Sequence, residues 1–168
     1  MDEQTFLVRV HAELDRAYRL AGLLLERQDG AEDVTHDAVI SAWRSLSTLR
    51  DENKFQPWFD RIVINACRDR LRRERRIRFV KLDAAASVAT TDDPFDAMLR
   101  ADAALEALAR LDMDLRVVLV LRYWADLSVD QIAERLAIPS GTVKSRLNRG
   151  LKRIRRDIGD RSPAEALT

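Results

Sequence analysis

Residues 126–156 have the sequence DLSVDQIAERLAIPSGTVKSRLNRGLKRIRR, and this stretch decides the fold. Ser128 and Gln131 have the spacing of a capping box, in which two side chains satisfy free amide groups at the start of a helix. Pro139 ends the short helix that follows, because proline lacks an amide donor and restrains the residue before it. Ser140 is a favoured N-cap residue, so a second helix is expected directly after the break.

This second helix is expected to be apolar on one side and basic on the other. The apolar positions recur at helical spacing and are Val143, Leu147, Leu151, Ile154 and Ile158. At about 100° per residue, the opposite side carries Ser145, Asn148, Arg149, Lys152 and Arg156, with Thr142 at its edge. Two helices joined by a tight turn in this way are typical of a helix-turn-helix. Such a basic helix fits the major groove of DNA, although a hairpin with a merely solvated basic face is the alternative.

The formal net charge is only +1, but the charges are segregated along the chain. Residues 61–81 and 135–161 each hold 9 basic and 2 acidic residues. Residues 1–60 hold 7 basic and 12 acidic residues, and residues 82–134 hold 4 and 11. Two basic blocks between acidic blocks indicate two anion-binding surfaces on a chain whose other surfaces repel DNA.

The length of 168 residues allows one or two small domains, and the single cysteine, Cys67, can form neither an intrachain disulfide nor a zinc cluster. Without a signal-peptide pattern or a long apolar run, we expect a soluble cytoplasmic protein with no membrane insertion. Strand patterns are missing, so an all-α fold is predicted. The sequence carries no catalytic or phosphate-binding motif, and it predicts no catalytic residue, no metal and no cofactor.

Helical spacing and composition predict two small helical domains joined by a linker. The expected parts are a first domain over residues 1–76, a linker rich in alanine, threonine and aspartate over 77–100, a helix-turn-helix domain over 101–158, and a tail over 159–168. In the first domain, one helix face carries residues that fall within about 80° of each other, namely Arg61, Asn65, Arg68, Arg72 and Arg75. A basic stripe beside an aromatic-bearing loop suits single-stranded DNA, with a solvated helix end as the alternative.

Three stretches of the chain occur in the order of three regions of bacterial RNA polymerase sigma factors. AEDVTHDAVISAWRS (residues 31–45) resembles region 2.2, FQPWFDRIVINACRDRLRRERR (55–76) resembles regions 2.3 and 2.4, and LSVDQIAERLAIPSGTVKSRLNRGLKRIR (127–155) resembles region 4.2. Over nearly its whole length the chain is similar to the extracytoplasmic-function (ECF) group of the sigma-70 family. The resemblance implies sigma2-like and sigma4-like domains that bind core polymerase and promoter DNA and direct transcription initiation.

The resemblance also implies roles for individual residues. Contact with the β′ clamp helices of core polymerase is expected from Glu32, Asp33, Asp37 and Arg44. Contact with the single-stranded −10 element is expected from Lys54, Phe55, Arg61, Asn65, Arg68 and Arg72. Contact with the −35 element in the major groove is expected from Thr142, Lys144, Ser145, Asn148, Arg149 and Lys152. The family further implies contact with the β flap of the polymerase and inhibition by an anti-sigma factor.

One departure from the family concerns stability, and two other functions stay open. Gly150 stands where alanine is commoner, and glycine there is expected to loosen the helix by up to about 1 kcal/mol. A stand-alone helix-turn-helix regulator, dimeric on operator DNA, is one alternative, but it leaves the basic block at 61–81 unexplained. A purely protein-binding adaptor is the other, and it predicts that Asn65 and Arg149 are dispensable.

Overall fold

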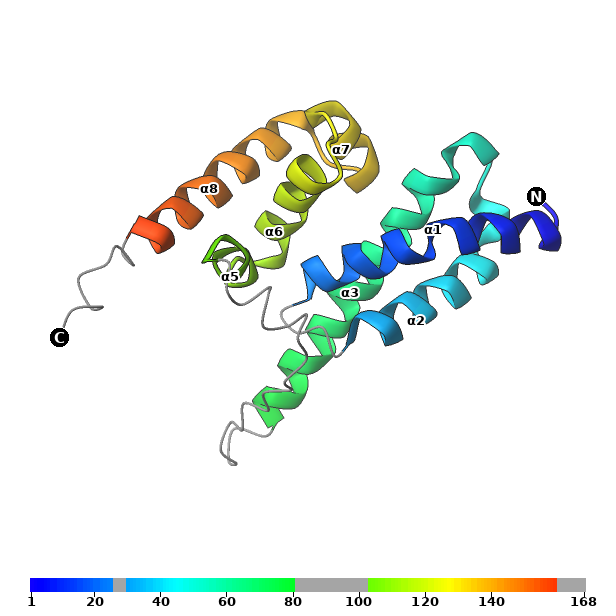
Figure 1. The fold of residues 1–168 in the computed structure, drawn as a ribbon, viewed down its shortest axis with the longest axis horizontal. Coiled ribbons are helices and arrows are strands. Elements are labelled where there is room, and N and C mark those ends of the chain that lie inside the picture. The colour runs from blue at the N-terminus through cyan, green and yellow to red at the C-terminus, as the bar shows by residue number, and fades with distance from the viewer. Residues whose placement is uncertain (26–29, 81–102, 160–168) are drawn as a thin grey trace. The chain divides into compact units, whose positions relative to one another are not determined.

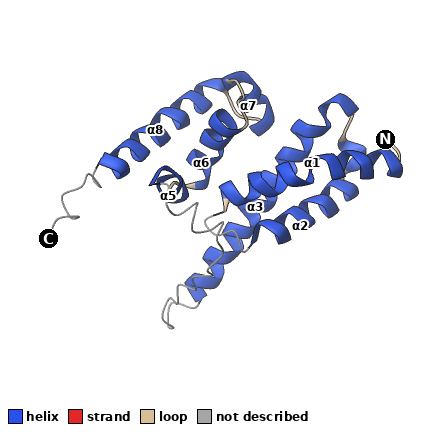
Figure 2. Ribbon diagram, viewed as in Figure 1, coloured by secondary structure: helices blue, strands red, loops and turns tan. Residues whose placement is uncertain are grey.

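The computed structural model describes residues 1–25, 30–80 and 103–159, and every regular element in these ranges is a helix (Figure 2). By its internal contacts the chain divides into two compact units, residues 1–88 and residues 89–168. The predicted all-α fold is therefore confirmed. Residues 81–100 of the predicted linker and residues 160–168 of the predicted tail lie outside the described residues.

The first unit contains three helices, and each packs against the other two (Figure 1). They are α1 (Glu3–Leu24), α2 (Ala31–Arg44) and α3 (Phe55–Val80), with the short 3-10 turns η2 (Leu46–Thr48) and η3 (Glu52–Lys54) between α2 and α3. Because α3 continues to Val80, the linker does not begin at residue 77 as the composition suggested. The arginine-rich stretch favours helix by intrinsic propensity, and the helix runs on through it.

The core of the first unit is built from the inward sides of all three helices. Its buried side chains include Phe6, Val10, Leu20, Leu24, Val34, Ala38, Phe55, Phe59, Val63 and Ile64. Aromatic rings form a cluster at one end of this core, where the Phe6 ring lies 5.2 Å from Trp43 and 6.2 Å from Phe55 between centroids. These contacts join the start of α1 to the end of α2 and the start of α3, and so position the loop between them.

In the second unit, α8 (Ser140–Gly159) is the central element (Figure 1). It packs against α5 (Ala103–Ala109), α6 (Met113–Leu119) and α7 (Val129–Leu136), and the π-helical turn η4 (Val120–Trp124) continues α6. Asp112 is the N-cap residue of α6 and separates this helix from α5. The core contains Leu111, Val117, Val118, Leu121, Ile132 and Val143.

Gly150 lies where α8 crosses α6 closely. A Cβ atom added to Gly150 would lie 2.8 Å from Cδ1 and 3.3 Å from Cγ of Leu119, whose side chain is itself buried. Carbon atoms in good contact are about 3.5–4.0 Å apart, so a larger side chain would force the packing to shift. The predicted loosening concerns α8 alone, whereas the approach of Leu119 is a second effect that depends on the neighbouring helix.

A buried arginine closes the turn between α5 and α6. The Arg116 side chain donates to the backbone carbonyl oxygen of Leu111 at 2.8 Å and to that of Ala109. Both carbonyl groups lie at or just after the end of α5, where backbone carbonyl groups have no amide donor within the helix and a cation is favoured. Arg116 therefore belongs to the interior of the second unit rather than to its surface.

Candidate nucleic-acid interface

The helix-turn-helix predicted from the sequence is formed by α7, a tight turn and α8. The Ser128 side chain accepts from the amide of Gln131 at 3.2 Å, and the Gln131 side chain accepts from the amide of Ser128 at 2.8 Å. This is the predicted capping box. At the other end of α7, Ala137 has the left-handed conformation, with φ 52 and ψ 48, which turns the chain sharply towards α8.

Ser140 has a different role from the one predicted. The first amides of α8 are satisfied by the carbonyl oxygen of Pro139, which accepts from Thr142 at 2.9 Å and from Val143 at 3.2 Å. The hydroxyl of Ser140 instead donates to the carboxylate of Asp130 on α7 at 2.8 Å. The Ser140 hydroxyl therefore links α7 and α8 across the turn and helps to hold the angle between these two helices.

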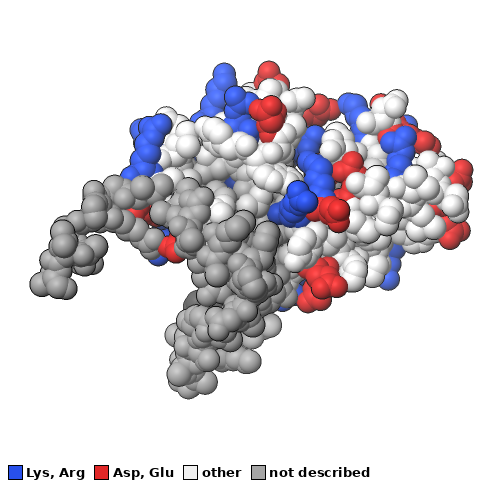
Figure 3. Space-filling view, in the orientation of Figure 1, with Lys and Arg blue, Asp and Glu red and all other residues white. Residues whose placement is uncertain are grey.

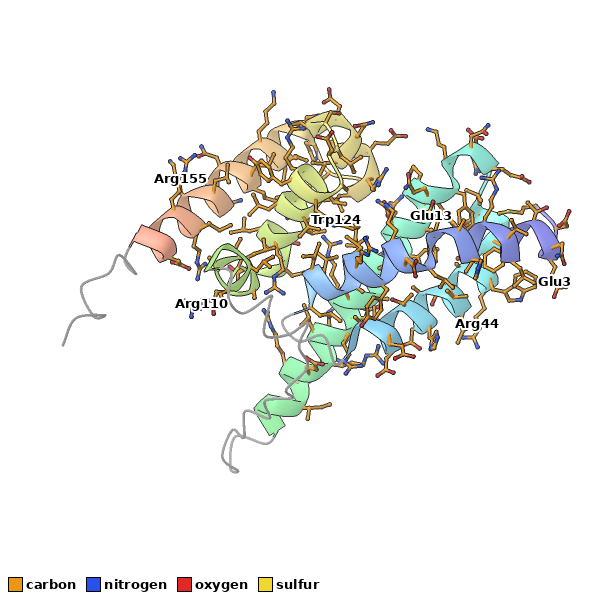
Figure 4. All side chains as sticks on the ribbon, in the orientation of Figure 1. Glu3, Glu13, Arg44, Arg110, Trp124 and Arg155 are labelled. Atoms are coloured by element: carbon orange, nitrogen blue, oxygen red, sulfur yellow. The ribbon has the colours of Figure 1, made fainter. Side chains whose placement is uncertain are left out.

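The outward side of α8 carries the predicted DNA-binding residues. Lys144, Ser145, Asn148, Arg149 and Lys152 are exposed, and Thr142 is half-buried. Figure 3 shows lysine and arginine side chains along the outer edge of this helix, and Figure 4 labels Arg155 among them. Within the part of the chain that the structure describes, Lys144, Arg149 and Lys152 form no ion pair, so their charge is open to an external anion.

Two further arginines near this face are paired with acids of α6. Arg146 donates to Asp114 at 2.8 Å, and Arg153 lies 3.5 Å from Asp112. Residues 146 and 153 are two turns apart and so lie on the same side of α8, towards the N-terminus of α6. The basic residues of α8 are thereby divided into an unpaired outward set and a paired set at its edge.

Most of the predicted −10 residues lie on the outward side of α3. Arg61, Asn65 and Arg72 are exposed, and Arg68 is half-buried. Arg72 is 3.4 Å from Asp69 in a solvent-exposed pair, and such pairs contribute little to stability. The structure thus brings the arginine and asparagine stripe together on one helix, as its spacing predicted.

Phe55 does not belong to this exposed set. It is only 2% exposed, and its ring packs against Phe59 and Trp58, with centroids 5.8 and 5.7 Å away. The prediction that Phe55 contacts the single-stranded −10 element was wrong, because this aromatic ring at the start of an amphipathic helix packs into the core. Its neighbour Lys54, at the end of η3, is exposed.

The loop before α3 is held in place by hydrogen bonds. The carboxylate of Asp51 accepts from the amide of Asn53 at 3.0 Å, which forms the η3 turn. Arg9 of α1 donates to the carbonyl oxygen of Glu52 at 3.0 Å, and the indole of Trp58 donates to the hydroxyl of Thr48 at 3.1 Å. Hydrogen bonds from α1 and α3 therefore hold the loop that carries the exposed side chains.

A buried ion pair fixes α3 against α1. The guanidinium of Arg16 makes two hydrogen bonds to the carboxylate of Asp60, one of them at 3.0 Å, and the Asp60 side chain is 2% exposed. Burial disfavours the charge of Arg16, but the hydrogen bond and charge of Asp60, with Glu13, outweigh it and raise the pKa of Arg16. Asp60 directly precedes Arg61, so this pair sets the position of the exposed stripe.

Sequence reasoning missed Asp60, although a signal for it existed. It shares the inward side of α3 with Phe59, Val63 and Ile64, where a carboxylate is costly unless a cation meets it. A charged residue in an apolar stripe therefore predicts a partner on a neighbouring helix. Only the packing of α1 against α3 identifies that partner as Arg16.

The predicted polymerase-binding residues lie on α2, and all four are exposed: Glu32, Asp33, Asp37 and Arg44. At 100° per residue, Asp33, Asp37 and Arg44 lie within about 40° of each other, whereas Glu32 is about 100° from Asp33. Three of the residues therefore share one face, and Glu32 lies beside it. Arg44 is labelled in Figure 4.

Asp33 is also connected to α3 through Arg70. The Arg70 guanidinium lies 2.7 Å from Glu74 and 3.4 Å from Asp33, whose side chain stays 70% exposed. Hydrogen bonding to Glu74, opposed by partial burial and supported by Asp33, raises the pKa of Arg70. A Cβ atom on Gly30 would lie 3.2 Å from this guanidinium, so the glycine at the start of α2 leaves room for it.

Family models match both units of the chain. Sigma-70 region 2 matches residues 9–77, and Sigma-70, region 4 matches residues 101–154. The ECF RNA polymerase sigma factor SigM of Mycobacterium tuberculosis is 34% identical over 142 residues, which are 84% of this chain and 71% of that protein. The chain belongs to the ECF RNA polymerase sigma factors. We therefore call residues 1–88 the region 2 unit and residues 89–168 the region 4 unit.

Other sigma factors show similar extents of similarity. The ECF RNA polymerase sigma factor SigW of Bacillus subtilis is 29% identical over 171 residues, 95% of this chain and 91% of that protein. The fold is also that of a solved structure, the sigma factor RpoE in complex with the anti-sigma factor NepR from Bartonella quintana. That match has a TM-score of 0.75 at 22% identity and covers 93% of this chain and 98% of RpoE.

None of the described helices combines the length and apolar composition needed to cross a membrane. Within the described ranges, no group of histidine, cysteine, aspartate and glutamate side chains could hold a metal ion. The candidate interface consists of basic, acidic and amide side chains on α2, α3 and α8.

Proposed function

We propose that this sigma factor contacts the two promoter elements with the outward sides of α3 and α8, and core polymerase with the acidic face of α2. The observation that carries the proposal is the placement of unpaired basic and amide side chains on the long helix of each unit. On α8 these residues are Lys144, Asn148, Arg149 and Lys152, and on α3 they are Arg61 and Asn65. Each set lies on a helix whose other side is buried in its own unit.

The α8 face suits double-stranded DNA of the −35 element. A helix of this size enters the major groove, and the residues near its N-terminus reach the edges of the bases. The first half of α8 holds Thr142, Lys144, Ser145 and Asn148. Arg149 lies about one turn after Ser145, and Lys152 lies about one turn after Asn148. Arg149 and Asn148 have the side chains that make paired hydrogen bonds to guanine and adenine, and the lysines neutralise phosphates.

The α3 face suits a single strand of the −10 element. Arg61, Asn65, Arg68 and Arg72 form the stripe, and Lys54 lies at the loop before it. A strand that has left the duplex exposes base edges, and unpairing each base costs a few kcal/mol that contacts must offset. Because Phe55 is in the core, base stacking on its ring plays no part in this proposal.

The acidic face of α2 is proposed to bind a basic surface of core polymerase, the β′ clamp helices. Asp33, Asp37 and Arg44 supply one exposed face, and Glu32 extends it. The region 4 unit would make a second contact with the β flap. The sigma factor would act wherever RNA polymerase does, which is the cytoplasm of a bacterium.

An anti-sigma factor is a further proposed partner. The related fold of RpoE was solved with the anti-sigma factor NepR, and CnrH was solved with the cytosolic domain of CnrY. A partner of this class would have to cover the α3 and α8 faces to block promoter contact. Loss of promoter binding on addition of such a partner, restored by its removal, would support this part.

In vitro transcription tests the proposal as a whole. The purified protein is mixed with bacterial core polymerase lacking sigma and a genomic DNA library, and the new 5′ ends are sequenced. Initiation behind a shared pair of upstream and downstream motifs is expected. Co-migration with polymerase without any initiation would contradict the promoter-contact part, and failure to co-migrate would favour a stand-alone regulator.

A further inference from the structure

We infer that Asp112 and Asp114, at the N-terminus of α6, determine which cations of α8 are available to DNA. They do so by engaging Arg146 and Arg153, so that DNA meets a narrower set of charges than the sequence of α8 contains. This inference rests on the proposed function of α8, and it assigns a specificity-determining role to two residues outside the helix-turn-helix.

The first step is the geometry of the two pairs. Arg146 lies 2.8 Å from Asp114, and its side chain is 19% exposed. Arg153 lies 3.5 Å from Asp112, and its side chain is 45% exposed. The two acids lie in the cap and first turn of α6, and the two arginines lie two turns apart on one side of α8.

The second step is the position of these arginines relative to the proposed DNA face. At 100° per residue, Arg153 lies about 40° around α8 from Arg149, and Arg146 lies about 60° from it. Both therefore stand at the edge of the outward face rather than on the far side of the helix. A long, flexible arginine side chain released from its acid could reach a phosphate that Arg149 or Lys152 already approaches.

The third step is electrostatic. Each phosphate that a cation neutralises adds about 0.9 to the slope of log affinity against log salt. While Asp112 and Asp114 neutralise two edge cations, those cations add little to this sequence-independent binding. Binding then depends more on the base-contacting residues Asn148 and Arg149, which favours specific over non-specific sites.

The test measures the salt dependence of DNA binding by the full chain. Fluorescence anisotropy with a labelled duplex of random sequence is recorded between about 50 and 200 mM salt. Asp114→Asn keeps the volume of the side chain and removes one charge. For this variant we expect the slope of log affinity against log salt to steepen by about 0.9, which is an additional 3.5-fold change in affinity over that range. For the double variant Asp112→Asn with Asp114→Asn we expect the slope to steepen by up to about 1.8.

The chain offers a matched control for the loss of one negative charge. Asp126 is exposed, lies in the same unit and, within the described ranges, forms no ion pair. Its φ of 51 is in the left-handed region, where asparagine is well tolerated, so Asp126→Asn should fold normally. We expect its slope to stay near that of the unchanged protein. Thermal unfolding of each variant confirms that the fold is retained.

Lys152→Gln separates failure of this inference from failure of the proposed function. Lys152 is one of the unpaired outward cations, so its loss should flatten the slope by about 0.9. If Lys152→Gln flattens the slope while Asp114→Asn matches Asp126→Asn, the role of the α6 acids is refuted and the α8 interface stands. If Lys152→Gln changes nothing, the proposed α8 interface is refuted, and the inference with it.

Discussion

Replacing Gly150 by alanine should destabilise the region 4 unit, although the same change stabilises most helices. Intrinsic propensity favours alanine over glycine by up to about 1 kcal/mol in a helix interior. At Gly150, however, the new Cβ would lie 2.8 Å from Leu119 Cδ1, 3.3 Å from Leu119 Cγ and 3.7 Å from Leu115 Cβ. The first two distances are shorter than the roughly 3.5–4.0 Å of a good carbon contact.

The size of the effect follows from how far Leu119 can move. Its side chain is 3% exposed, so it cannot swing into solvent, and either its rotamer or the α6–α8 spacing must change. Extra carbon in a packed core costs about 1–3 kcal/mol. After the gain in helix propensity, Gly150→Ala should lower the free energy of unfolding of this unit by about 1 kcal/mol.

Thermal and urea unfolding of the full chain, monitored by circular dichroism, measures this change. Gly141→Ala, in the same helix, is the matched control. A Cβ atom added to Gly141 would have no neighbouring atom within 4 Å, so this change should stabilise the unit. In a Leu119→Val background, which removes the crowding methyl group, Gly150→Ala should be less costly by about 1 kcal/mol. If Gly150→Ala stabilises the unit as much as Gly141→Ala does, the close approach of α6 and α8 described above is refuted.

The remaining predictions concern the region 2 unit and promoter contact. Asp60→Ala should cost about 2–3 kcal/mol of unfolding free energy, because it leaves the half-buried Arg16 without its main partner. Glu13→Ala, which removes the carboxylate 3.7 Å from Arg16, should cost less than about 1 kcal/mol. Equal costs would contradict the dominance of Asp60. Asp33→Arg combined with Asp37→Arg should weaken binding to core polymerase, measured by co-migration, while Asn65→Ala should leave that binding near normal and impair DNA opening, measured by permanganate footprinting. A reversed pattern would assign the faces of α2 and α3 the other way round. Arg149→Ala should weaken use of the upstream element by about 1–3 kcal/mol if its base contact is direct, and an equal loss on promoters with a scrambled upstream element would contradict that contact.

Patterns local to one helix were predictable from the sequence. The capping box of Ser128 and Gln131, the break at Pro139 and the outward side of α8 all follow from spacing along a single segment, because a helix places residues three and four apart on one side. The all-α fold and the basic stripe of α3 were predictable for the same reason. The family resemblance added roles for these faces, which spacing alone does not reveal.

Tertiary structure decided the features that depend on two helices meeting. Phe55 is part of the core, and Ser140 bonds to Asp130 across the turn. Leu119 lies so close to Gly150 that an added Cβ would have to displace it. The division of the α8 arginines into paired and unpaired sets is set by acids that lie 32 and 41 residues away in the sequence. A helical pattern shows which way a side chain points but not what it meets, because contacts between distant segments depend on how the helices pack.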